Sequence, residues 1–317
     1  GPQDAIMSLA FSAQSRFLAA AGPGGVVVWN VESLRNVPLT SKHGETELPE
    51  RTTIPAATWI YFSETACHVL VLGTWDGSLQ LWDYNPERSV RTVRKSVAHT
   101  SAVQVVSMDF LQQEVPMGGR AKLATSFADH SVSVWTLSAD GELKKTFSVA
   151  FDKVIMPKTV QFDSTTGNLY VFAFHGGSVV FLDGLTGNII WTKKNGPAVM
   201  GSVSLDQTCE QFAACTSQGF ELFDLDRLTH IRAFSCEPVL ISVPKNIQFS
   251  DYGTTVVGGT DRGSALVYDV ENGRVIQTLS YHRGGLVQAV ATSTKENDFL
   301  VAIGGSNANQ ACDVILW

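Results

Sequence analysis

The sequence predicts an all-β fold in which seven similar four-stranded antiparallel units follow one another along the chain. A short pattern, a tight polar turn followed by an alternating strand that ends on a bulky residue, occurs seven times. Apolar residues in these runs alternate with a period of two, as they do in half-buried strands. No helical pattern of apolar residues at i, i+3, i+4 and i+7 is sustained anywhere in the chain.

The seven copies of this pattern divide the chain into units of similar length. They are GGVVVWNV (24–31), DGSLQLWDY (76–84), DHSVSVWTL (129–137), GGSVVFLDG (176–184), SQGFELFDL (217–225), RGSALVYDV (262–270) and CDVILW (312–317). Their bulky anchors are Trp29, Trp82, Trp135, Leu182, Phe223, Tyr268 and Trp317. Neighbouring anchors lie between 41 residues (Leu182 to Phe223) and 53 residues (Trp29 to Trp82) apart, which indicates one supersecondary unit per repeat.

Each unit contains three further strand-like runs. An apolar run such as HVLVLGT (68–74) precedes each anchor strand, so the two form a β-hairpin. A shorter run such as VQVVSMDF (103–110) comes before the hairpin, and a polar run such as GELKKTFSV (141–149) follows several anchors. Four strands in a meander make one blade of a β-propeller. We therefore expect a single seven-bladed domain over residues 3–317, with Gly1 and Pro2 as the remnant of a cleaved tag.

The chain resembles the WD-repeat (WD40) family of β-propellers, with degenerate repeats. The best matches are LWDY (81–84) and the combination of His99 with ADHSVSVW (128–135). In that family a His, a small hydroxyl residue, a turn Asp and a strand Trp form a buried hydrogen-bonded network. The resemblance gives these structural roles to His99, Ser126 (or Thr125), Asp129 and Trp135. Since buried polar groups need partners, we expect Asp129→Ala to destabilise the fold by about 1–3 kcal/mol.

No catalytic constellation stands out in the sequence. It contains no GxSxG elbow, no GxxxxGK[ST] phosphate loop and no HExxH zinc helix, and its seven histidines lie far apart. The segment LDGLTGNIIW (182–191) matches a motif of quinone-dependent propeller dehydrogenases, but it occurs once. We interpret it as a Thr-Gly turn with Trp191 packing between blades. The sequence predicts a non-enzymatic protein without a cofactor or a metal.

The composition of the chain limits which binding partners and which cellular compartment are expected for the protein. The formal net charge is −7, so the long-range field repels polyanions and nucleic acid is not expected as a partner. No apolar run is long enough to span a membrane. The five cysteines form no CxxC and are odd in number, which favours reduced thiols. Together with a start that does not resemble a signal peptide, this predicts a cytoplasmic or nuclear protein.

Function is expected at the rim of one flat face, where loops from several blades converge. Position by position, the resemblance places Trp75, Phe174 and Thr260 on that face, and Tyr281 and Arg283 in the last link between blades join them. Exposed aromatic residues are enriched at binding sites, although these side chains could instead pack between blades. We predict a scaffold that binds a protein or peptide. The alternative is a small-molecule or glycan-binding propeller that stacks its ligand on Trp59, Trp75 and Trp191.

The seventh blade raises a separate expectation. The chain as given stops at the seventh anchor, Trp317, and only Gly1 to Asp4 precede the first inner strand. We therefore expect a three-stranded last blade with an unpaired edge along CDVILW (312–317). Either further chain beyond Trp317 or a strand from a partner would pair with this edge.

Overall fold

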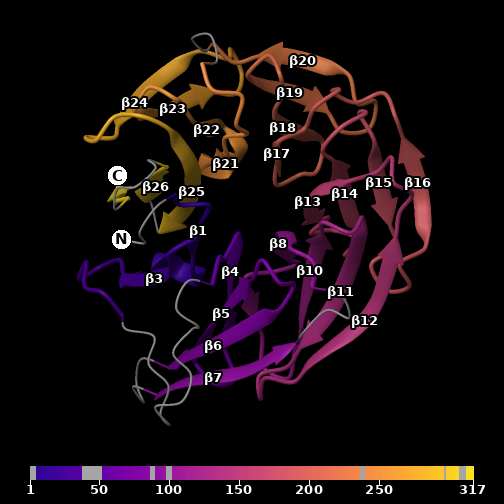
Figure 1. Cartoon of the computed structure of the whole chain (residues 1–317), viewed down its shortest axis with the longest axis vertical. Coiled ribbons are helices and arrows are strands. Elements are labelled where there is room, and N and C mark those ends of the chain that lie inside the picture. The colour runs from indigo at the N-terminus through magenta and orange to yellow at the C-terminus, as the bar shows by residue number, and fades with distance from the viewer. Residues whose placement is uncertain are drawn as a thin grey trace.

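The computed structural model describes residues 5–37, 52–85, 90–97, 102–235, 240–295, 298–306 and 312–317, without the side chains of 90–97, Lys295 and Asp298. Within these ranges the chain forms seven β-sheets arranged as the blades of a propeller around a central axis (Figure 1). The only helical turns described are two short 3-10 turns, Ala13–Ser15 and Asp251–Gly253. The predicted all-β, seven-bladed fold is confirmed.

The blades follow one another in chain order. Blades 3 to 6 have four antiparallel strands each, with the first strand innermost and the fourth outermost in Figure 1. Their bounds are: blade 3, β8 (Val105–Phe110), β10 (Ala121–Phe127), β11 (Ser131–Leu137) and β12 (Leu143–Ala150); blade 4, β13 (Pro157–Phe162), β14 (Leu169–Ala173), β15 (Val179–Leu182) and β16 (Ile189–Lys193); blade 5, β17 (Ser202–Leu205), β18 (Gln211–Cys215), β19 (Phe220–Asp224) and β20 (His230–Ala233); blade 6, β21 (Ile247–Ser250), β22 (Thr255–Gly259), β23 (Ser264–Asp269) and β24 (Val275–Ser280).

The other three blades depart from the four-stranded plan. In the described residues blade 1 has three strands, β1 (Ser8–Phe11), β2 (Phe17–Gly22) and β3 (Gly25–Asn30). Blade 2 has β4 (Ala56–Phe62), β5 (Cys67–Gly73), β6 (Leu79–Asn85) and β7 (Val90–Val97), and β9 (Glu114–Val115) adds a short parallel strand to β4. Blade 7 has three strands, β25 (Val287–Lys295), β26 (Asp298–Gly305) and β27 (Val314–Leu316), as predicted.

The bulky anchors occupy one equivalent position in the third strand of the blades. Trp82, Trp135, Leu182, Phe223 and Tyr268 are all buried there. Trp29 is half-buried, and Trp317, which exchanges backbone hydrogen bonds with Val301 directly after β27, is 45% exposed. The seventh anchor therefore keeps its backbone position but lacks the cover that the others have.

The core is divided among the contacts between neighbouring blades. Seven apolar clusters of described residues each draw their side chains from two adjacent blades. The cluster between blades 5 and 6, for example, joins Phe220 and Phe234 to Ile247 and Tyr268. A sheet of three or four strands cannot bury both faces by itself, so each blade needs both neighbours to complete its core.

A belt of hydrogen bonds links the inner strands around the central axis. A side-chain oxygen of one inner strand accepts the backbone N–H of the next: Asp109 from Phe162, Gln161 from Leu205, Ser204 from Phe249, and Gln248 from Thr292, at 2.7–3.1 Å. These residues occupy the same position in blades 3, 4, 5 and 6. The belt supplies acceptors to backbone groups that the sheets leave unpaired, and it fixes each blade relative to the next.

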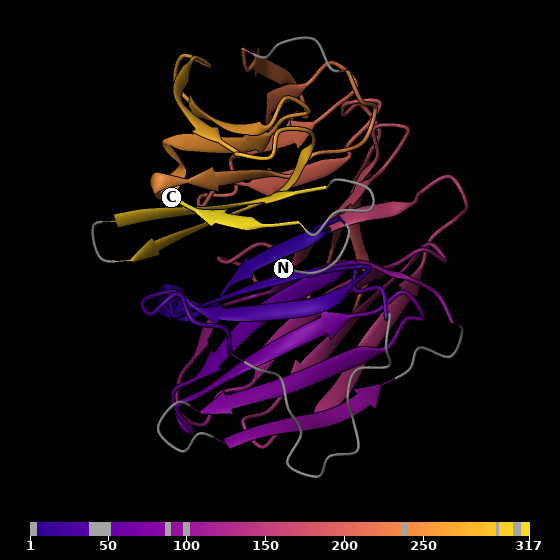
Figure 2. The same cartoon turned by 60° about the vertical axis from the view of Figure 1, so that its left-hand side comes forward.

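Blade 7 closes the ring against blade 1. Ile6 donates its backbone N–H to the carbonyl of Gly305 at 3.1 Å, and the Ser15 and Ser293 hydroxyls lie 2.7 Å apart. Figure 2 shows the last strands beside the first ones. Individual hydrogen bonds and an apolar cluster therefore join blade 7 to blade 1, whose strands belong to two separate sheets in the described residues.

Candidate functional site

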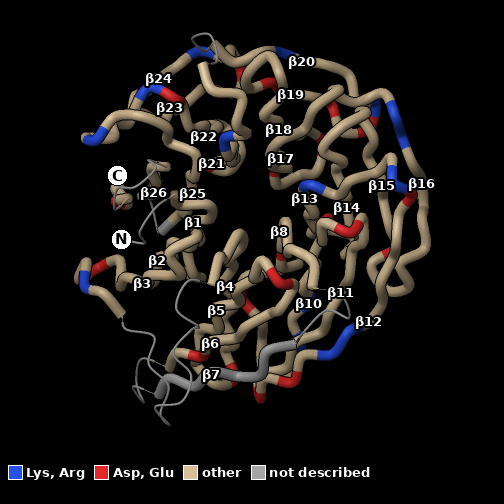
Figure 3. The backbone as a smooth tube through the Cα atoms, in the orientation of Figure 1, with Lys and Arg blue, Asp and Glu red and all other residues tan. Residues whose placement is uncertain are grey.

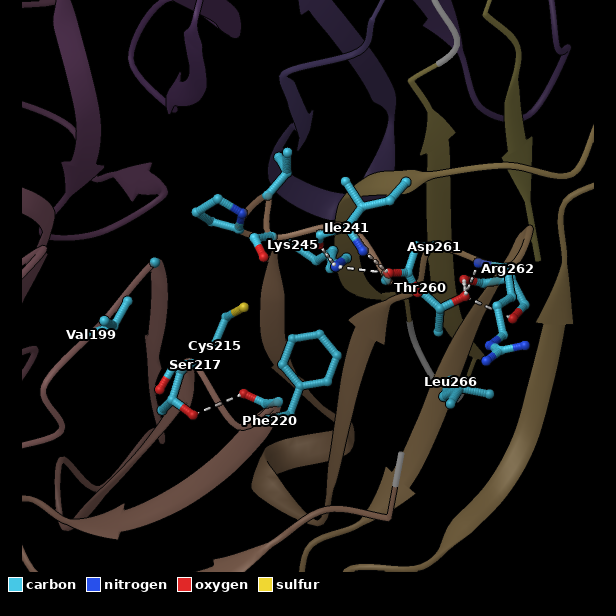
Figure 4. A pocket seen from close by; sticks show the side chains of 18 of the residues that line it. Val199, Cys215, Ser217, Phe220, Ile241, Lys245, Thr260, Asp261, Arg262 and Leu266 are labelled. Atoms are coloured by element: carbon cyan, nitrogen blue, oxygen red, sulfur yellow. Dashed lines mark hydrogen bonds and ion pairs between the residues drawn. The ribbon is translucent and has the colours of Figure 1, made fainter. Parts of the chain in front are cut away.

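A cavity of about 500 Å³ opens between blades 5 and 6 at one end of the ring. The four strands of a blade alternate in direction, so the turn between its second and third strands lies at the same end as the link to the next blade. Turns of blades 4, 5 and 6 and the link from β20 to β21 line the cavity, which we call the blade 5–6 pocket (Figure 4). Its wall includes Val199, Cys215, Phe220, Ile241, Lys245 and Leu266.

The inner wall of the pocket is apolar and closely packed. Phe220, at the start of β19, directs its ring into the space between the blades (Figure 4) and packs on Gly258 of β22. A Cβ atom at Gly258 would lie 2.4 Å from that ring, so only glycine allows this contact. Cys215 and Tyr268 are also buried in this wall. Most of what an occupant would meet here is hydrocarbon and aromatic surface.

The rim of the pocket exposes aliphatic side chains to water. Leu240, Ile241 and Val243, on the link between blades 5 and 6, are 64%, 41% and 37% exposed. Ile241 and Val243 also line the cavity. Single exposed apolar residues are ordinary, but three in one short segment beside an apolar cavity form a patch of the kind found at binding surfaces.

A buried ion pair holds this link in place. The Asp261 Oδ2 atom accepts the backbone N–H groups of Leu240 and Ile241, both at 2.7 Å, and lies 3.4 Å from the Lys245 Nζ atom. Lys245 also donates to the Ile241 carbonyl at 2.7 Å. Burial would raise the pKa of Asp261, but the two backbone hydrogen bonds and the Lys245 charge outweigh it and lower the pKa. We call these contacts the Asp261 latch.

The turn that carries Asp261 is itself well determined. Thr260 donates its hydroxyl to the Ser264 carbonyl at 2.8 Å, and Thr74 makes the same bond to Ser78 in blade 2. Gly263 has a φ of +74°, and a Cβ atom there would lie 2.5 Å from the Gly284 Cα atom. The turn therefore packs closely on the link between blades 6 and 7, so Asp261 is presented from a fixed position.

A second, polar cavity of about 280 Å³ follows the central axis of the ring. Inner-strand residues line it, among them Lys158, Asp109, Gln161 and Gln248. Figure 3 shows a basic segment at β13 on the inner side of the ring. Gly201, Pro244 and Lys245 line both cavities, so the mouth of the channel and the blade 5–6 pocket share an edge.

Two charged residues in the channel have altered pKa values. Burial raises the pKa of Asp109 to about 7, although the backbone N–H groups of Phe162 and Phe110 act in the opposite direction. Burial also lowers the pKa of Lys158. In both cases the low-dielectric surroundings disfavour the charged form.

The structure brings two of the five predicted partner-binding residues into the pocket. Phe174 and Thr260 both line it, and the two residues that follow them, His175 and Asp261, do so as well. Trp75 is 56% exposed on the corresponding turn of blade 2, but it does not line the pocket. The expectation that Trp75 is exposed on its turn is therefore confirmed. Its role in binding stays a prediction.

The last two predicted residues belong to the contact between blades 6 and 7. Tyr281 is buried, and its hydroxyl accepts the backbone N–H of Asp313 at 3.1 Å. Its ring packs against Gly305, where no larger residue would fit. Arg283 is exposed and donates its Nε–H to Asp313. The expectation that Tyr281 joins an exposed rim is wrong, because the glycine beside it leaves space for the ring inside the blade contact.

The expected buried network of blade 3 is present only in part. Trp135 donates its Nε1–H to the Thr125 hydroxyl at 2.9 Å, and both residues are buried. The Ser126 hydroxyl is buried and has no hydrogen-bond partner among the described residues. Asp129 is exposed rather than buried, and it accepts from the backbone and hydroxyl of Ser131 at 3.1 and 2.6 Å. His99 lies outside the described residues.

The three tryptophans suggested for stacking on a glycan do not form one platform. Trp59 is buried between blades 1 and 2 and donates its Nε1–H to the Ala10 carbonyl at 3.1 Å. Trp191 is half-buried and packs against Tyr170 and Phe181 of blade 4. Only Trp75 is exposed. The Thr-Gly turn before Trp191 is as predicted: Asp183 accepts the N–H groups of Leu185 and Thr186 at 3.0 and 2.7 Å.

Sequence reasoning missed most of the pocket. The segment 240–245 and Phe220 were not singled out, because the repeat pattern does not show which residues of neighbouring blades meet. One signal was available: LISVP (240–244) places three apolar residues in a link between strands, where polar residues are usual. An apolar run in a surface connection indicates either a buried link or a contact surface.

Comparison with protein-family models and with curated proteins finds no match to this chain. What is shown is a seven-bladed β-propeller with an apolar pocket between two blades. Among the described residues no helix is long and apolar enough to cross a membrane. Nor do three or more His, Cys, Asp or Glu side chains in the described ranges gather as they would around a metal ion.

Proposed function

We propose that the protein is a non-catalytic interaction scaffold that binds an extended peptide segment of a protein partner at the blade 5–6 pocket. The observation that carries the proposal is the apolar cavity of about 500 Å³ with the exposed aliphatic rim of Leu240, Ile241 and Val243. Buried apolar anchors in preformed pockets dominate the affinity of most protein interfaces. The rim supplies the apolar surface around such an anchor.

The size of the pocket favours a peptide with more than one anchor. A cavity of about 150 Å³ holds a single benzene ring, so a space of about 500 Å³ accepts two large apolar side chains. Links and turns from three blades converge on it, and a peptide lying across the opening contacts all of them. The Asp261 latch keeps the aliphatic rim ordered before the partner arrives, which reduces the entropic cost of binding.

The family and the compartment of the protein are proposed on other features of the chain. We propose that the chain is a degenerate WD-repeat propeller, which the third-strand Trp82 and Trp135 and the Thr125–Trp135 hydrogen bond support. We also propose a reducing compartment, cytoplasmic or nuclear. The odd number of cysteines and the lack of a CxxC motif support that assignment.

The test is a peptide selection followed by a matched pair of variants. Peptides are selected from a random display library on the wild-type protein, and their dissociation constants are measured by fluorescence polarisation. Ile241→Asp places a charge on the pocket rim and is expected to weaken binding at least tenfold. Ile231→Asp, on the outer strand β20, is the control, because Ile231 is 38% and Ile241 41% exposed. Equal losses in both variants, or no selectable peptide, would contradict the proposal.

A second candidate function is the binding of a small apolar molecule in the same pocket. A volume of about 500 Å³ lies within the range of small-molecule sites. A thermal-shift screen of aromatic fragments tests it, with Cys215→Trp as the variant that fills the cavity. Fragments that stabilise the wild type but not Cys215→Trp would favour a small ligand. The glycan version of this candidate loses its support, since its tryptophans do not meet.

A further inference from the structure

Lys158 is a cation in an enclosed position with no described counterion. It follows Pro157 at the irregular start of β13, where the pairing with β14 shifts by one residue. Its side chain lines the central channel, and its Nζ atom lies over the ring of Phe174, 5.9 Å from the ring centroid. No hydrogen bond or ion pair joins it to another residue in the described part of the chain.

The position of Lys158 connects the channel to the blade 5–6 pocket. Phe174, which Lys158 contacts, lines the pocket. The edge between the two cavities is formed by Gly201, Pro244 and Lys245. The Lys245 ammonium is already engaged by Asp261 and by the Ile241 carbonyl. Among the described residues that line the channel, Lys158 is thus the cation that remains available on this side of the edge.

Resting on the proposed function, we propose that the peptide bound in the blade 5–6 pocket carries an acidic residue next to its apolar anchors, and that this carboxylate crosses the shared edge to pair with Lys158. The recognition motif is therefore an aromatic or aliphatic residue with an Asp or Glu a short distance along the chain. The apolar wall provides affinity, and Lys158 selects for the acidic neighbour.

The surroundings of Lys158 make a carboxylate the favoured occupant. Gln161 and Gln248, which also line the channel, already use their side-chain oxygens to accept backbone N–H groups of the belt. An ammonium that is partly removed from water without a counterion is costly, and burial lowers the pKa of Lys158 accordingly. A carboxylate replaces the lost hydration and raises this pKa again.

The experiment uses the peptides selected on the wild-type protein. Each peptide that contains Asp or Glu is compared with its Asn or Gln counterpart. Lys158→Met keeps the aliphatic stem but removes the charge. It is expected to raise the dissociation constant of the acidic peptide about tenfold and to change that of the amide peptide by less than twofold. Lys153→Met is the matched control, since Lys153 lies exposed on the link before the same strand. Unfolding midpoints of both variants establish that they fold.

The outcomes separate this inference from the proposed function. One contrary result is that the selected peptides bind Ile241→Asp more weakly and yet show no enrichment of Asp or Glu. Another is that they bind Ile241→Asp more weakly but bind Lys158→Met as tightly as the wild type. Either result contradicts the proposed pairing with Lys158 and leaves peptide binding at the blade 5–6 pocket supported. If no peptide depends on Ile241, both proposals fail. A rise in the Lys158 pKa on binding, followed by NMR of the lysine side chain, would be a second, independent confirmation.

Discussion

At the scale of single residues, blade 3 contains side-chain hydrogen bonds that a hydrophobic pattern does not reveal. In blade 3 the buried Trp135 indole is bound to Thr125, whereas Asp129 lies at the surface and binds within its own turn. The two residues therefore contribute differently to stability, although both belong to the same expected network. An unsatisfied buried donor loses its full hydration, and an exposed carboxylate does not.

Thr125→Val is expected to destabilise the protein by about 1–3 kcal/mol, because it leaves the Trp135 indole N–H buried without its acceptor. Asp129→Ala is expected to cost less, about 1 kcal/mol, because the Asp129 carboxylate is itself exposed. Urea unfolding of both variants gives the comparison. A larger loss for Asp129→Ala than for Thr125→Val would contradict this ranking.

Asp109 is expected to make the stability of the ring depend on pH. Its pKa rises from the usual 3.8 to about 7 in the folded chain, so the folded state holds a proton that the unfolded state has lost. The stabilising contribution is complete below about pH 4 and is lost as the pH rises through about 7. Asp109→Asn removes this dependence.

The measurement for Asp109 is the melting temperature of the wild type and of Asp109→Asn between pH 4 and pH 8. The wild type is expected to lose stability relative to the variant over that interval, because one pKa unit corresponds to about 1.4 kcal/mol. A constant difference between the two proteins across the interval would show that the carboxyl is not protonated in the folded state.

At the scale of elements, the pocket depends on one link held by one turn. The backbone N–H groups of Leu240 and Ile241 reach the Asp261 carboxylate from a segment with no regular secondary structure. The turn after β22 is rigid, because Thr260 and Gly263 fix its backbone. The link takes its order from the turn, so removing the carboxylate should loosen the link and leave the blades intact.

Asp261→Ala is expected to speed amide hydrogen exchange across 240–245 at least tenfold and to cost roughly 2 kcal/mol of stability. Asp183→Ala, in an exposed turn of blade 4, is the control and should leave these amides unchanged. Because the pKa of Asp261 is lowered, the latch of the wild type persists above about pH 4 and is lost only as the pH falls through the lowered pKa. If amide hydrogen exchange across 240–245 is the same in Asp261→Ala as in the wild type, the Asp261 latch does not order this link.

At the scale of the whole molecule, the contact between blades 7 and 1 joins the two blades that have three strands in the described residues. Its buried cluster contains four alanines, Ala20, Ala289, Ala291 and Ala302, beside larger residues such as Phe11. Because neither flanking blade has a fourth strand in the described residues, we expect this contact to open first.

Native-state hydrogen exchange measures this order directly. Amides of β1, β26 and β27 are expected to exchange through smaller opening free energies than those of β18, β19 and β22. The edge of β27 adds to the difference, because no fourth strand is described beside it. Equal protection of the two groups of strands would mean that the ring opens as one unit.

The sequence by itself determined the features that depend on neighbours along the chain. Alternation, turn residues and the spacing of anchors predicted the seven blades, the hairpins and the three-stranded last blade, because strands and tight turns are set by local sequence. For the site, the resemblance to WD-repeat propellers placed Phe174 and Thr260 on turns that line the pocket, since turns at equivalent positions of a repeat share one face.

Only the tertiary structure decided which of these turns form a site. The pocket joins Cys215, Phe220, Ile241 and Leu266, which come from separate strands and a link, and their approach depends on how two blades pack. Burial was decided in the same way: Tyr281 enters the space beside Gly305, whereas Asp129 stays in water. Packing between blades sets the exposure and charge environment of each side chain, and neither quantity is encoded by the residue's own repeat.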